Sequence, residues 1–159
     1  MRPEPKEKID ARAYRVWQLN GWTTGVIFAS ITLTLFIVGN LFDWPQFIWI
    51  IGAVVTLLIV VFFVFVIPGI RMKRWRYEVF EEEVDIQHGV LVTKRTLIPM
   101  VKVQQVDTEQ GPYLKKYGLA TVALSTAAGR HEIPALSQEV AAQLRDQIAK
   151  LARVTENDI

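Results

Sequence analysis

The chain has 159 residues, of which 51% are hydrophobic, and its formal net charge is +2. It contains no cysteine and only two histidines, which excludes disulfides, thiol nucleophiles, thiolate metal sites and histidine-rich metal sites. Residues 71–159 hold 13 Lys and Arg against 12 Asp and Glu, so this part is nearly neutral and a nucleic-acid-binding function has little support.

The first 21 residues are interpreted as an N-terminal segment. Residues 1–10 mix charges and contain Pro3 and Pro5, a composition that predicts disorder. Residues 11–20 place Arg12 and Arg15 among aromatic and aliphatic side chains. This stretch is either a simple extension of the following helix or a separate helix at the membrane interface.

Residues 22–68 contain two apolar runs, 22–42 and 44–67, separated by Asp43. Each run has about 20 residues or slightly more, enough for a helix to cross the roughly 30 Å hydrocarbon layer. We predict a transmembrane helical hairpin in which Asp43 caps the second helix and Pro68-Gly69 ends it. The alternative, two core helices of a soluble protein, is disfavoured because this chain is too short to cover so much apolar surface.

The distribution of Lys and Arg predicts the topology. Both ends of the hairpin are basic, whereas residues 40–44 between the two runs contain neither Lys nor Arg. Basic flanks stay on the cytoplasmic side. We therefore expect a protein of the cell membrane with two spans, both termini in the cytoplasm and the connecting loop outside.

Beyond the hairpin, hydrophobic residues alternate with a period of two in several short runs, which predicts strands. A turn is expected at Glu81-Glu82. Residues 90–98 are expected to form one long strand, in which Lys94 and Arg95 are a solvated or edge feature that discourages strand pairing. A later strand over 130–133 is expected to end at Pro134. A helix should begin after Ser137 and present an apolar stripe of Val140, Leu144, Ile148 and Leu151. The prediction is a small barrel of about six to seven antiparallel strands with a C-terminal amphipathic helix over 71–153, then a tail over 154–159.

This order of elements resembles the pleckstrin-homology (PH) fold. The resemblance is sharpest over residues 101–122, VKVQQVDTEQGPYLKKYGLATV, and is supported by Trp75-Arg76-Tyr77, Gly89-Val90 and Ile133-Pro134. The chain is similar to the membrane-flanked bacterial PH-domain family, most closely to its YdbS-like members. The resemblance implies a cytoplasmic PH-like barrel, assembly with a larger relative that carries several such domains, and a link to cell-envelope stress tolerance. It implies no catalytic residue.

Two basic regions are candidates for contact with anionic lipid. Four cations lie within six residues directly after the second span, and two more lie in a short aromatic segment. Each cation near an anionic surface contributes about 1 kcal/mol of attraction. The alternatives are a plain topology signal for the first region and inward packing of the flanking side chains for the second. The candidates are Arg71, Lys73, Arg74, Arg76, Lys115 and Lys116.

Two further groups are candidates for contact with a protein partner. Gln104, Gln105, Asp107 and Gln110 crowd at one strand end, where they form a polar surface or, alternatively, cap the loop. Gly25 and Ala29 form a small face on the first span that a partner helix could approach closely, or they face lipid. Ser30 and Thr34 are instead expected to pack inside the hairpin against Gly52 and Thr56.

Known catalytic motifs are absent from the sequence, including the Gly-rich phosphate loop, Gly-x-Ser-x-Gly and His-Glu-x-x-His. The spans contain no His, Lys, Arg or Glu, which disfavours a proton or ion path. We therefore expect a non-catalytic membrane-anchored scaffold that needs no cofactor or metal. Its expected partners are membrane lipids and a larger membrane protein with related PH-like domains, with homo-oligomerisation as a further option. The alternative function is an anionic-lipid-surface binding module.

Overall fold

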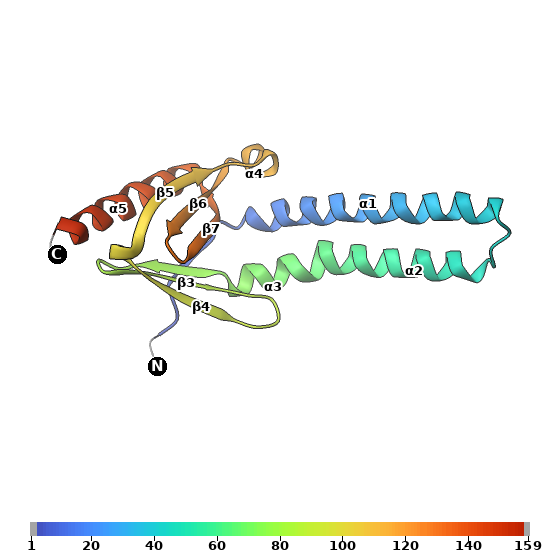
Figure 1. Cartoon of the computed structure of the whole chain (residues 1–159), viewed down its shortest axis with the longest axis horizontal. Helices are drawn as coiled ribbons and strands as arrows, with labels where there is room; N and C mark the ends of the chain where they lie inside the picture. Colours follow the sequence, from blue (N-terminus) through green and yellow to red (C-terminus); the bar gives the residue numbers. More distant parts are fainter. Residues whose placement is uncertain (1–2, 158–159) are drawn as a thin grey trace. The chain divides into compact units, whose positions relative to one another are not determined.

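The computed structural model describes residues 3–157 and divides into two compact units (Figure 1). One unit is Tyr14–Ile70, which contains the apolar helices. The other unit combines the residues before Tyr14 with those from Arg71 onward. Both ends of the chain therefore contribute to the same folded domain.

The apolar unit is a pair of long helices. Helix α1 spans Ala13–Leu41, and the second helix runs from Phe47 to Arg74 through α2 (Phe47–Val61), the π-helical turn η1 (Phe62–Val66) and α3 (Ile67–Arg74). Both are long and apolar enough to cross a membrane, and few of their side chains are buried in the protein. The prediction of two apolar helices is confirmed, and residues 13–20 extend the first helix.

Two details of the hairpin differ from the prediction. Asp43 does not cap the second helix, whose N-cap is Gln46; Asp43 instead takes a left-handed backbone conformation with φ 53° in the connecting turn. The second helix also continues through Pro68 to Arg74. Proline removes one N–H from the helix. The wider turn at η1, in which the N–H of Ile67 donates to the carbonyl of Phe62, lies directly before it.

The two long helices meet along a face of small residues. The hydroxyls of Thr32 and Thr56 are 2.8 Å apart, and the Cγ2 of Thr32 lies 3.4 Å from where a side chain on Gly52 would begin. The expected packing of Ser30 and Thr34 is wrong, because both are exposed and their hydroxyls donate to carbonyls of their own helix. The observed face is displaced by two residues, about 200° around the helix.

The domain contains two antiparallel sheets and a C-terminal helix. One sheet has the order β1 (Glu7–Lys8), β2 (Arg76–Val79), β3 (Glu83–His88) and β4 (Lys94–Pro99). The other has the order β5 (Val103–Glu109), β6 (Leu119–Thr126) and β7 (Gly129–Ser137). Short helices η2 (Met100–Lys102) and α4 (Pro112–Lys116) flank β5, and α5 (Gln138–Asn157) ends the described chain. This arrangement confirms the predicted PH-like fold class.

Residues 3–13 form an arm that is built into the domain, so the prediction of disorder is wrong for the described part of this segment. Strand β1 pairs with β2, and the N–H of Asp10 donates to the carbonyl of Ala135 in β7 at 3.0 Å. Pro5, Ile9 and Ala13 are buried. The arm therefore touches both sheets.

Strand β3 is buried on both faces, although its alternating pattern predicted one solvent-facing side. Asp85 is 1% exposed and accepts hydrogen bonds from Arg95 of β4, the shortest at 2.6 Å. Arg95 also donates to the carbonyl of Pro3 in the arm at 2.8 Å. Arg95 is exposed on β4, the edge strand of its sheet, which agrees with the interpretation from sequence, and the arm adds a contact to its guanidinium.

Two strand boundaries also differ. Residues 90–93 form a loop, and β4 begins only at Lys94. Strand β7 was expected to stop at Pro134 but continues to Ser137. Its register against β6 shifts between Ala120 and Val122, and Ala135 has φ 55°. Proline is tolerated at such a bulge because no regular ladder bond is lost there.

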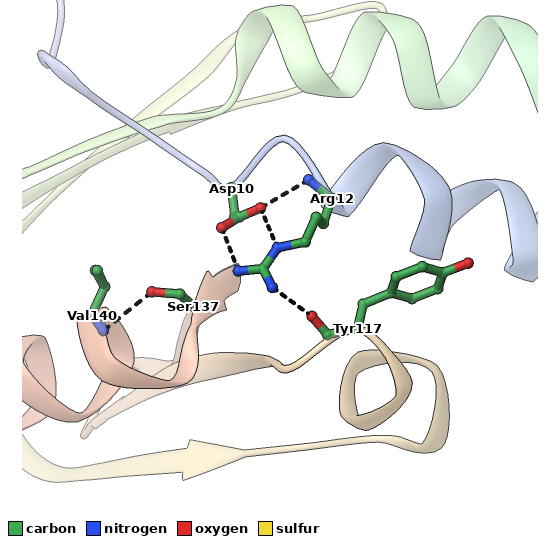
Figure 2. Close-up of polar contacts among 5 residues, drawn as sticks. All are labelled: Asp10, Arg12, Tyr117, Ser137 and Val140. Atoms are coloured by element: carbon green, nitrogen blue, oxygen red, sulfur yellow. Dashed lines mark hydrogen bonds and ion pairs between the residues drawn. The ribbon is translucent and has the colours of Figure 1, made fainter.

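Helix α5 packs its apolar side on the sheets. The hydroxyl of Ser137 accepts from the N–H of Val140, which confirms the predicted N-cap (Figure 2). Leu144 and Ile148 are buried as expected, together with Ala141. Val140 is 41% exposed, so the buried stripe begins at Ala141 rather than at Val140.

Candidate membrane and partner contact sites

Helix α4 carries the exposed Lys115 and Lys116 and is held to the N-terminal arm by Arg12. The guanidinium of Arg12 donates to the carbonyl of Tyr117 at 2.9 Å and to both carboxylate oxygens of Asp10 (Figure 2). The hydrogen bond from Arg12 lowers the pKa of Asp10. Gly118, with φ 65°, ends the turn beside Arg12. Arg12 therefore joins the turn after α4 to the N-terminal arm of the same domain.

The four cations after the second span fall into different environments. Arg71 and Lys73 are exposed on α3. Arg74 donates at 3.4 Å to the carbonyl of Leu91 and to the hydroxyl of Thr93. Arg76 lies in β2, where its guanidinium is 3.7 Å from the carboxylate of Glu4. Arg71, Lys73 and Arg74 therefore form one basic group with the loop at 90–93, whereas Arg76 belongs to the arm contact.

The end of β3 that begins at Glu83, away from the loop at 90–93, is acidic. A groove there is lined by Pro3, Phe80, Arg95 and five acidic residues: Glu78, Glu81, Glu82, Glu83 and Asp85. Arg95 is engaged by Asp85 and contributes little free positive charge. An anionic headgroup would be repelled from this groove.

The polar residues on and after β5 that were predicted to contact a partner lie in different environments. Gln104 and Gln105 are exposed on this edge strand of its sheet, and the amide of Gln105 donates to Asp107 at 2.9 Å. Gln110 has a structural contact instead, because its amide donates to the carbonyl of Leu119 at 2.8 Å. Gln104, Gln105 and Gln110 are exposed and Asp107 is half-buried, but only Gln110 is held by a main-chain contact.

The two small residues proposed for a partner helix also differ from each other. Gly25 is buried inside the hairpin, where Val60 lies only 2.8 Å from the position that a Cβ would occupy. Its expected role toward a partner fails because the bulky residue opposite fills the space that the glycine leaves. Ala29 is exposed and borders an apolar groove between the helices, together with Leu33, Ala53 and Leu57.

The two remaining features of the described domain concern metal binding and His88. Within residues 3–157, no group of three or more His, Cys, Asp or Glu side chains is placed to hold a metal ion. His88 stacks on Trp75 with ring centroids 5.0 Å apart. Burial, followed by the charge of Lys94, lowers the pKa of His88, so this histidine is neutral at pH 7.

Two features of these surfaces were missed at the sequence level. Arg12 was interpreted only as a topology signal, and its contact to Tyr117 joins residues 105 positions apart, which no local pattern reveals. Leu91 and Val92 were placed in a strand, although the preceding Gly89, with φ 141°, marks a tight turn. Because no second turn signal follows Gly89 in the sequence, residues 90–93 were assigned to the following strand.

The comparisons with known proteins agree with this architecture. The family model described as "Bacterial PH domain" matches residues 25–152. The UPF0699 transmembrane protein YdbS of Bacillus subtilis (strain 168) is 46% identical over 166 residues, which cover 100% of both chains. The UPF0699 transmembrane protein YdbT of the same organism is 27% identical over 95 residues, 57% of this chain and 19% of that protein. No solved structure matches significantly.

Both relatives are named as transmembrane proteins and neither name states an enzymatic activity. The family match covers the second span and nearly all of the folded domain, and the full-length relative has the same extent as this chain. The chain belongs to the bacterial PH domain family, as a transmembrane member of the YdbS type.

Proposed function

We propose that this protein is a non-catalytic assembly factor, anchored in the membrane by its helical hairpin, whose cytoplasmic PH-like domain binds a larger membrane protein with related domains. The proposed complex contributes to cell-envelope stress tolerance. The observation that carries the proposal is the similarity to YdbT, in which the matched 95 residues make up only 19% of the relative. A short and a long member of one family thus occur in the same organism.

The surface on β5 is the best candidate for the cytoplasmic contact. Gln104 and Gln105 are exposed, and uncharged amides are less costly to desolvate than charges when a partner covers them. As an edge strand, β5 can also offer main-chain groups to a partner. In the membrane, Ala29 is the residue of the predicted pair that remains accessible to a partner helix.

The alternative function is that of a binding module for anionic lipid surfaces. The exposed Lys115 and Lys116, and the basic group on α3, favour this alternative. The acidic groove at the other end of β3 argues against a headgroup site there.

Affinity purification of the tagged full chain from native membranes in mild detergent tests the proposal. The expected result is stoichiometric recovery of a larger membrane protein with related PH-like domains. Recovery of the chain alone, with retained lipids enriched in anionic species relative to the membrane, would favour the alternative. In that case the enrichment should fall when Lys115 and Lys116 are both replaced by Gln.

A further inference from the structure

The loop between β3 and β4 exposes two aliphatic side chains on a shape that is fixed by local contacts. Leu91 is 89% exposed and Val92 is 79% exposed, values above those of every large apolar side chain in α1 and α2, where Leu41 is highest at 76%. A side chain on Gly89 would collide with the carbonyl oxygen of Val92, so the turn is tight and requires glycine. We call residues 90–93 the tip.

The tip is bound to the end of the second long helix. Arg74 donates to the Leu91 carbonyl and to the Thr93 hydroxyl, and Trp75 stacks on His88 where β3 enters the loop. Arg74 follows Ile70, the last residue of the apolar unit, by four positions. At 1.5 Å per helical residue this is a rise of about 6 Å.

That rise limits how far the tip can be from the bilayer. The headgroup region adds roughly 5–8 Å on each side of the hydrocarbon layer. The helix from Phe47 to Arg74 has 28 residues, or about 42 Å, and therefore exceeds the hydrocarbon thickness. Arg74, and the loop that it binds, consequently lie at headgroup depth.

The charges around the tip fit an anionic surface. Residues 88–96 contain no acidic residue and contribute Lys94, since Arg95 is paired with Asp85; Arg71, Lys73 and Arg74 lie on the adjoining helix end. The acidic turn at 81–83 lies at the far end of β3, which has six residues and a length of about 20 Å. An anionic membrane therefore attracts the tip end of this strand pair and repels the other end.

We propose that the tip is a membrane-insertion loop: Leu91 and Val92 enter the boundary between headgroups and acyl chains of the bilayer that holds the hairpin, while Arg74 and Lys94 contact lipid phosphates. Aliphatic side chains flanked by cations bind at this depth in interfacial segments. The insertion fixes the PH-like domain against the membrane. It does not depend on which protein partner the domain binds.

The test uses single cysteines, which the native chain lacks. Leu91→Cys carries an environment-sensitive fluorophore, and the full chain is reconstituted into vesicles of phosphatidylcholine and phosphatidylglycerol with a quencher attached near the lipid headgroup. The expected result is a blue-shifted emission and a large loss of intensity with the quenching lipid. Glu81→Cys, at the acidic turn, is the matched control and should show neither effect.

Two results would overturn the proposal. A water-like, unquenched signal at Leu91→Cys, equal to that of Glu81→Cys, would place the tip in solution. A blue-shifted signal that the lipid quencher does not reduce would show that protein, such as a second copy, covers the tip. Val92→Cys repeats the measurement at the adjacent position, and the same two results there overturn the proposal if Leu91→Cys does not fold.

Discussion

Arg12 holds two parts of the domain together through a single guanidinium group. It binds Asp10 in the arm and the Tyr117 carbonyl after α4, and Ala13 directly behind it is fully buried. The arginine therefore ties the N-terminal arm and the turn at Tyr117 together at the point where the first long helix begins. A residue that serves as a topology signal in the sequence is also a structural tether.

The Asp10–Arg12 pair gives the arm a pH dependence. Because Arg12 lowers the pKa of Asp10, the pair stabilises the folded arm above the ordinary pKa of aspartate, and this stability is lost as pH falls through the lowered pKa. The protection of the β1 amides from hydrogen exchange, relative to the intrinsic exchange rate at each pH, should therefore fall in acid. Asp10→Asn should exchange faster already at neutral pH and show a smaller acid effect.

The control for this prediction is Asp146→Asn, because Asp146 pairs with Arg145 on the exposed side of α5. It should leave exchange in β1 unchanged. Equal protection of β1 in Asp10→Asn and the native chain at neutral pH would show that the pair does not hold the arm.

At the scale of residues, the sequence pattern predicted which strand faces are apolar, but it did not predict which charged side chains are buried. Alternation in β3 indicates one buried side only and would leave Asp85 facing solvent, whereas Asp85 is buried. The arm covers the second side through Pro3, whose carbonyl binds Arg95 from 92 positions away. No local pattern encodes such a contact.

At the scale of elements, the structure differs most from the prediction in the seam of the hairpin, that is, in the faces along which its two helices pack. The turn near Asp43 was predicted correctly, so residues face each other at roughly the expected depth. The facing side of α1 was misassigned, since the choice rested on the small residues Ser30 and Thr34. In apolar helices the hydrophobic period carries no information about facing, because almost every position is apolar.

Cysteine cross-linking distinguishes the two seams. The Thr32→Cys, Thr56→Cys variant should form an intramolecular disulfide readily, because the native hydroxyls are 2.8 Å apart. The Ser30→Cys, Thr56→Cys variant should not. Adding Gly25→Leu to the first variant should reduce cross-linking, since Val60 already occupies the space beside Gly25. Preferential cross-linking of the Ser30→Cys, Thr56→Cys variant would instead support the packing predicted from the sequence, in which Ser30 faces the second helix.

Helix α5 is the element whose role was predicted most completely, from its Ser137 cap to its buried Leu144. Leu144→Ala should lower the free energy of unfolding of the domain by about 2–5 kcal/mol, the usual cost of a cavity in a core. Val140→Ala, at a position 41% exposed, should change it by no more than about 0.5 kcal/mol.

Hydrogen exchange of β6 and β7 in the full chain in detergent measures both variants, because it reports opening of the domain separately from the spans. Equal effects of Leu144→Ala and Val140→Ala would contradict the packing of α5 on the sheets.

At the scale of the whole molecule, the domain is discontinuous in sequence: its arm precedes the hairpin and the rest follows it. Sequence patterns predicted the PH-like strands and the final helix from their periods, and the hairpin from the length of its two apolar runs. They did not predict that the arm closes the domain, since a two-residue strand and two prolines give no periodic signal.

The predicted membrane topology places the turn of the hairpin outside the cell and the PH-like domain inside, and this prediction can be tested by cysteine labelling. Asn40→Cys, beside the turn of the hairpin, should react with an impermeant maleimide on intact cells, and Glu81→Cys should react only after permeabilisation. The reason is the excess of Lys and Arg on the two ends of the hairpin. The reverse labelling pattern would place the PH-like domain outside the cell.

Association with a larger relative through β5 is the central claim. Its most direct test is co-purification of that relative with three tagged chains: the native chain, a Gln104→Arg, Gln105→Arg variant, and a matched Gln143→Arg, Gln147→Arg variant on the exposed side of α5. We predict that the native chain and the α5 variant retain the larger PH-domain protein, while the β5 variant loses it but keeps its membrane level. Purification of the native chain without any larger relative would contradict the claim.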